Sequence, residues 1–161
     1  MSRRILIIFA LGAISAYGFA AFVLVLSAQM GILPTQADVA PGRLEAALFG
    51  SALRASVAHH APGGGNPMPA SGENLVAGAN LYRQMCARCH GSSVESENPY
   101  GRSFFPPAPN LLFARPSYTD SEMFWVIKHG IRNTAMPAWG NLLSEEDIWQ
   151  VVTFLRKSPA D

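Results

Sequence analysis

The sequence predicts an all-α protein in which one long apolar helix precedes a small helical domain. Two helix starts are visible: Thr119-Asp120-Ser121-Glu122 is a capping box, and Ser144 is an N-cap residue before an acidic first turn. After Ser144, apolar residues recur at the spacing of one helix face, namely Ile148, Val151, Val152 and Leu155. We find no convincing strand run, and proline-rich loops separate the helical stretches.

The N-terminal apolar stretch predicts a membrane anchor. It runs from Ile5 to Ser27 without a charged residue, and as a helix it would be about 35 Å long, enough to cross a bilayer core of about 30 Å. Arg3 and Arg4 precede it, so the positive-inside rule places everything after Gln29 outside the cytoplasm. We therefore assign residues 1–30 to a transmembrane signal-anchor helix. A cleaved signal peptide is the alternative, but its apolar core is shorter, about 7–15 residues.

Residues 31–70 read as a linker with one helix inside it. Residues 43–58 are rich in alanine, and small apolar residues recur there near helical spacing. This helix would lie on the membrane surface, pack on a partner or act as a spacer. The stretch from Pro62 to Pro69 contains three consecutive glycines and breaks the helix, so we place the domain boundary there. The domain itself is expected over residues 71–161, with its first helix over residues 75–89.

Charge excludes one class of function. The chain has 12 lysines and arginines against 11 aspartates and glutamates, a net charge of +1. A nucleic-acid-binding domain carries a concentrated basic surface, and none is visible, so no nucleic-acid partner is expected.

The motif Cys86-Ala87-Arg88-Cys89-His90 is the attachment signature of c-type haem. The two cysteines lie three residues apart on one helix face, where both sulfurs reach the haem vinyl groups, and His90 then ligates the iron. These are the only cysteines of the chain. A structural zinc site needs four ligands and has no second pair here. A redox dithiol of thioredoxin type would require a βαβ context, which the sequence lacks.

Met136 is the best choice for the second axial ligand. It lies in the stretch from Asn133 to Trp139, in the loop between two predicted helices, and its thioether is soft and uncharged. Met/His ligation raises the reduction potential of haem iron. The other possible ligands sit in helices, in the linker or at the membrane edge, where a structural or surface role is expected: Met30, Met68, Met85, Met123, His59, His60 and His129.

Residues 71–161 resemble a class I cytochrome c domain. Gly78 and Tyr82 precede Cys86 on one helix face, as do the glycine and the aromatic residue that let the first and last helices of this family cross closely. Trp149 resembles the aromatic residue on the other side of that crossing. The resemblance implies a small helical fold around one covalently attached haem c.

Two loops extend this resemblance. The segment from Pro106 to Leu111 resembles the proline loop of the family, in which a prolyl carbonyl orients the ligand histidine; Pro107 and Pro109 are among its candidates. The string Met136-Pro137-Ala138-Trp139 resembles the distal loop of bacterial cytochromes c. Trp139 is expected in the haem pocket with an aromatic cluster, and two arginines are expected to pair with haem propionates: Phe104, Phe105, Phe113, Phe124 and Trp125 form the cluster, and Arg102 and Arg115 are the arginines.

The function implied is that of a monohaem electron carrier, not an enzyme. It would be anchored in the bacterial inner (cytoplasmic) membrane by a single pass, with the haem domain in the periplasm. Its expected partners are membrane redox complexes: a quinol-oxidising complex or dehydrogenase as donor, and a terminal oxidase or reductase as acceptor. A variant is a fixed cytochrome subunit of such a complex. The alternative is a haem c sensor or peroxidase-like enzyme with an open sixth iron position.

Overall fold

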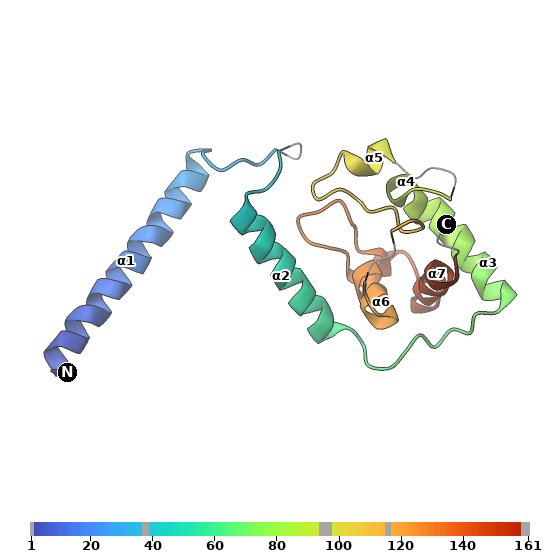
Figure 1. Cartoon of the computed structure of the whole chain (residues 1–161), viewed down its shortest axis with the longest axis horizontal. Helices are drawn as coiled ribbons and strands as arrows, with labels where there is room; N and C mark the ends of the chain where they lie inside the picture. Colours follow the sequence, from blue (N-terminus) through green and yellow to red (C-terminus); the bar gives the residue numbers. More distant parts are fainter. Residues whose placement is uncertain (1, 37–38, 94–97, 115–116, 159–161) are drawn as a thin grey trace. The chain divides into compact units, whose positions relative to one another are not determined.

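The computed structural model describes residues 2–36, 39–93, 98–114 and 117–158, and every regular element in these ranges is helical (Figure 1). The predicted all-α fold is confirmed. The chain divides into two compact units, Met1–Val39 and Ala40–Asp161. The first holds α1 and the second holds all other helices. In chain order the helices are α1 (Arg3–Gln29), α2 (Arg43–His60), α3 (Gly72–Leu81), a π-helical turn (Tyr82–Cys86), α4 (Ala87–His90), α5 (Pro99–Arg102), α6 (Asp120–His129), a 3-10 turn (Trp139–Asn141) and α7 (Glu145–Lys157).

Helix α1 has the length and composition of a membrane-spanning helix. It contains 27 residues, its most apolar window has a mean hydropathy of 2.2, and none of that window is buried within the protein. Large apolar side chains are exposed at many positions between Ile5 and Leu26, including Phe9 at 77% and Phe19 at 69%. Such a surface is stable in lipid, whereas in water it would be costly.

Helix α2 belongs to the second compact unit. Its C-terminal half packs on α6, with Val57 completely buried. The ring of His60 stacks on Trp125 of α6, with centroids 5.9 Å apart. The sequence predicted the helix but could not tell what it contacts. Its C-terminal half is packed against the rest of the domain and belongs to it.

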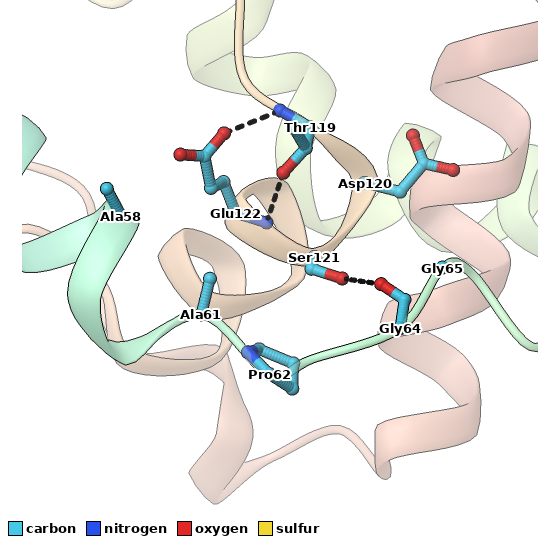
Figure 2. Close-up of a pocket in the computed structure, with 9 residues that line it drawn as sticks. All are labelled: Ala58, Ala61, Pro62, Gly64, Gly65, Thr119, Asp120, Ser121 and Glu122. Carbon is cyan, nitrogen blue, oxygen red and sulfur yellow. Dashed lines mark hydrogen bonds between the residues drawn. The ribbon is translucent and has the colours of Figure 1, made fainter.

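The segment after α2 is bound to the domain although its composition suggested a free linker. Ser121 of α6 donates a hydrogen bond to the carbonyl of Gly64 at 2.8 Å, as Figure 2 shows. The amide of Asn66 donates to the hydroxyl of Thr153 on α7, also at 2.8 Å. The compact unit that begins at Ala40 includes this segment, and specific side chains hold its irregular backbone.

These contacts predict that residues 40–70 stabilise the haem domain. A holoprotein that begins at Ser71 should unfold more readily than one that begins at Ala40. The loss is expected to be about 3–5 kcal/mol, from the burial of Val57 at about 1.5–3 kcal/mol and two hydrogen bonds at about 1 kcal/mol each. Denaturant unfolding of the two holoproteins measures it. Equal midpoints would show that the segment contributes no stability.

The core lies where α3 and α7 cross, with α6 packed beside them. Gly78 makes the crossing possible: a Cβ there would lie 2.1 Å from the backbone oxygen of Gln150 on α7. The aromatic partner of Tyr82 at this crossing is Phe154, with centroids 5.5 Å apart, rather than Trp149. Trp149 stacks instead on Phe124 of α6 at 4.2 Å.

Both predicted helix starts are confirmed. At α6, Thr119 accepts from the backbone N–H of Glu122 while the Glu122 carboxylate accepts from that of Thr119. Ser144 and Asp147 form the same reciprocal pair at α7. These caps fix where α6 and α7 begin, and the cap at Ser144 also fixes the C-terminal end of the loop that carries Met136.

Candidate haem site

The Cys-x-x-Cys-His motif lies at the end of one continuous helical stretch. Helix α3 passes through the π-helical turn into α4, which ends at His90. Gly91 follows with a φ of +77°, a left-handed conformation that glycine adopts without strain. Cys86 and Cys89 are half-buried and both are free thiols. The motif therefore presents two unpaired sulfurs and an imidazole from a single helix end.

The imidazole of His90 is oriented by a backbone carbonyl. Its Nδ1 lies 2.8 Å from the carbonyl oxygen of Pro109. A carbonyl only accepts, so Nδ1 carries the proton and Nε2 keeps the lone pair that a metal ligand needs. Burial lowers the pKa of His90, although the hydrogen bond to Pro109 opposes this shift. The ring is therefore neutral near neutral pH and ready to coordinate.

The thiol of Cys86 stays protonated until it is modified. Burial raises its pKa to about 12, and the neighbouring Cys89 adds to this rise. Among the described residues, no group of three His, Cys, Asp or Glu side chains could hold a metal ion. The cysteines therefore suit thioether formation better than a protein-only metal site.

Two polar side chains hold the end of the motif helix. The hydroxyl of Tyr82 donates to the carbonyl of Gly91 at 2.9 Å and lies 3.1 Å from that of His90. Burial raises the pKa of Tyr82, and Cys86 adds to the shift, so the hydroxyl remains a donor. The amide of Asn98 donates to the carbonyl of Arg88 at 2.8 Å. Carbonyl groups that α4 leaves without helical partners are thus satisfied.

The backbone of α5 lies so close to the motif that residue 101 must be glycine, because any side chain there would collide with the motif. A Cβ at Gly101 would lie only 2.0 Å from the carbonyl oxygen of Cys89. Sequence reasoning identified neither Gly101 nor Asn98 as part of the site. The sequence does contain a pattern typical of a helix start, namely Asn98 followed by Pro99 in the first turn. This pattern does not indicate which other element the helix contacts.

The Tyr82 hydroxyl predicts a specific stability effect. Tyr82→Phe keeps the ring contact with Phe154 and leaves buried carbonyls without their donor, so the free energy of unfolding should fall by about 1–3 kcal/mol. Tyr100→Phe is the matched control, because Tyr100 is 46% exposed. Denaturant titration of the two holoproteins makes the comparison. If both variants unfolded at the same denaturant midpoint as the unmodified protein, the Tyr82 hydroxyl would not stabilise the end of the motif helix.

The loop that carries Met136 has a closed, hydrogen-bonded geometry. The carbonyl of Met136 accepts from the backbone N–H of Ile131 at 3.2 Å. Its own N–H donates to the hydroxyl of Thr134 at 3.1 Å, and that hydroxyl donates to the carbonyl of Ile131. Gly130, with a φ of +68°, lets the loop fold back, because a Cβ there would lie 2.7 Å from the Met136 oxygen. The backbone of Met136 is therefore fixed in one position.

Several predicted site residues meet around one core. Cys86, Leu111, Met136 and Trp139 all pack against the hydrophobic cluster between α3, α6 and α7, although they come from three separate segments. Of the two candidate prolines, Pro109 supplies the carbonyl to His90, whereas Pro107 is exposed and no hydrogen bond of it to His90 is seen.

The predicted aromatic cluster does not form as one group. Phe124 is buried against Trp149, and Trp125 stacks on His60 of α2. Phe104 instead contacts Tyr100 edge-on at 5.1 Å, while Phe105 and Phe113 are 41% and 37% exposed. Arg102 lies exposed at the end of α5, and Arg115 lies outside the described residues.

This donor set fits haem c. It offers two unpaired thiols at the required spacing, a neutral imidazole with a free Nε2, and a thioether on a fixed loop that borders the same apolar core. The helical fold and this site together define a c-type haem protein of the class I cytochrome c kind.

Comparison with known proteins assigns the family. Residues 73–155, about half of the chain, match the family described as cytochrome c oxidase, cbb3-type, subunit III. The chain is also 31% identical over 88 residues to a cytochrome c550 of Pseudomonas aeruginosa; the match covers 52% of this chain and 55% of that protein. It therefore spans little more than half the length of that relative. The chain belongs to this cytochrome c family, which implies covalent haem c at Cys86 and Cys89 and haem-based electron transfer.

Proposed function

We propose that the protein is a membrane-anchored monohaem cytochrome c that carries single electrons between membrane redox complexes, with His90 and Met136 as iron ligands. The hydrogen bond from His90 Nδ1 to the Pro109 carbonyl carries the proposal, because it leaves Nε2 available in a neutral, fixed ring. When bound, the haem supplies a one-electron Fe(III)/Fe(II) couple.

The protein's own residues suit an electron carrier. His90 and Met136 are neutral ligands, and a methionine ligand favours a high reduction potential. The Pro109 carbonyl holds the histidine ring, while Thr134 and Ile131 hold the methionine loop, so both ligand positions are fixed before an electron arrives. Trp139 packs against the core cluster, and with haem bound this apolar side would exclude water from the site. A fixed ligand set requires little reorganisation when the charge on the iron changes.

Helix α1 supports the proposed location in the bacterial cytoplasmic membrane. Its length and hydropathy suit a single pass, and Arg3 and Arg4 at its N-terminal end favour a cytoplasmic N-terminus. The haem domain would then lie in the periplasm. Anchoring raises its effective concentration near membrane complexes. A quinol-oxidising complex or dehydrogenase would be the donor and a terminal oxidase or reductase the acceptor, with the protein either mobile between them or a fixed subunit.

Redox titration of the purified holoprotein tests the carrier role. The haem should titrate reversibly as a single one-electron centre, and hydrogen peroxide should not be turned over, because Met136 closes the sixth position. Rapid peroxide turnover would favour the peroxidase-like alternative instead.

Alkaline carbonate extraction of membranes tests the anchor. The full chain should stay in the membrane pellet, and a holoprotein that begins at Ala40, exported with a separate cleavable signal, should be released. Release of both proteins would contradict the membrane anchor.

A further inference from the structure

The N-terminal half of α2 presents a largely apolar surface, interrupted by the exposed Glu45, that the haem domain leaves uncovered. Three large side chains here are strongly exposed: Leu44 at 83%, Leu48 at 61% and Phe49 at 57%. Exposed apolar groups close together on a folded domain mark a surface that contacts something else.

The burial of successive residues on one face of α2 shows where the helix stops contacting the rest of the domain. Val57, Leu53, Gly50 and Ala46 follow one another at the spacing of one helix face. Val57 is completely buried, Leu53 and Gly50 are half-buried, and Ala46 is exposed. Only the Arg54 side chain of α2 itself lies within 4 Å of a Cβ placed at Gly50, so the contact with the domain ends near Leu53 and the first two turns of α2 project beyond it.

Chain connectivity indicates what covers these two turns. Residues 30–42 join the end of α1 to α2, and at full extension they reach at most about 48 Å. This segment contains one charged residue, Asp38, and it exposes apolar side chains such as Met30 at 67% and Ile32 at 64%. A connection of this length lets the start of α2 reach the surface of a bilayer that α1 crosses and limits its distance from that surface to about 48 Å.

The composition of the projecting turns suits a lipid surface. Leucine and phenylalanine side chains bind at the boundary of headgroups and acyl chains, where an apolar helix face sinks about 5–10 Å. Arg43 begins the helix and can extend its guanidinium toward phosphate groups.

We propose that the first two turns of α2 lie in the bilayer interface, with Leu44, Leu48 and Phe49 among the lipid chains. This inference rests on the proposed anchoring by α1. Because the other half of α2 is packed on α6, the lipid contact restricts how the haem domain can turn at the membrane. The domain would then meet its partners in a limited range of orientations.

Site-specific fluorescence on the full-length holoprotein tests this. Leu48→Cys is labelled with the NBD fluorophore, and the protein is reconstituted singly into nanodiscs of phosphatidylcholine and phosphatidylglycerol. Ala58→Cys is the matched control, since Ala58 is exposed on the packed half of the same helix. Nitroxide on the acyl chains should quench the Leu48 probe at least about twofold more than the Ala58 probe, because the apolar face lies about 5–10 Å deep.

The outcomes separate this inference from the anchor itself. Equal, weak quenching at both positions, in protein that remains on the disc, overturns the lipid contact and leaves the anchor intact. A blue-shifted Leu48 probe that lipid does not quench means that protein covers the face, and it also overturns the lipid contact. Protein that does not stay on the disc overturns the anchor, and the lipid contact with it.

Discussion

Replacing Met136 by alanine should leave haem attached but change the ligation and the reduction potential of its iron. Attachment depends on Cys86 and Cys89, which the substitution does not touch. Loss of the thioether removes the ligand that favours Fe(II), so the reduction potential should fall by a sizeable part of the roughly 0.8 V range that axial ligands cover. The oxidised protein should lose its far-red iron–sulfur absorption band, and the reduced protein should bind carbon monoxide. Absorption spectroscopy and redox titration measure these changes.

Met123→Leu is the matched control for this experiment. Met123 is another thioether of the same domain, but it is 4% exposed in the core on α6. A volume-conserving change there should cost less than about 1.5 kcal/mol of stability and leave the spectrum and potential as they were. If instead Met136→Ala had the spectrum and potential of the unmodified protein, Met136 would not be the ligand.

Replacing Gly78 by alanine should cause a large loss of stability. The new Cβ would lie 2.1 Å from the backbone oxygen of Gln150 and 2.9 Å from the Cβ of Phe154. A backbone oxygen cannot rotate away, so α3 and α7 must move apart. Overpacking of this kind costs about 1–3 kcal/mol and occasionally more. Thermal and denaturant unfolding of the holoprotein would show it.

Gly72→Ala provides the comparison within the same helix. Gly72 begins α3, and a Cβ there meets nothing within 4 Å. The substitution should be neutral or should stabilise by up to about 1 kcal/mol, because alanine restricts the unfolded chain. Similar unfolding midpoints for the two variants would mean that the helices do not cross at Gly78.

The features that sequence predicted well are local ones. The capping boxes at Thr119 and Ser144 involve residues three positions apart, so their pattern is complete within one short window. The cysteine spacing is equally local. The three prolines of the 106–109 segment could not be told apart from sequence, because the choice depends on which carbonyl faces His90 after the chain has folded.

The features that sequence missed depend on contacts between distant segments. The glycine-rich segment after α2 has the composition of a free linker, yet Asn66 is bonded to Thr153, far along the chain. The sequence suggested Trp149 as the aromatic residue at the helix crossing, whereas Phe154 is the one that contacts Tyr82. This difference has a similar cause. Both residues lie on α7, and the crossing point of two helices decides which one faces Tyr82. The spacing of apolar residues identifies the buried face of a helix, but it does not say where along that face a second helix crosses.

The absorption spectrum of the detergent-purified, full-length holoprotein tests the central claim most directly. It would be recorded oxidised and reduced, with and without carbon monoxide. Ligation by His90 and Met136 predicts a c-type reduced spectrum, a weak far-red iron–sulfur band in the oxidised form, and no response to carbon monoxide. Immediate carbon monoxide binding without the far-red band would mean an open iron, which contradicts the electron-carrier assignment and favours a haem sensor or enzyme.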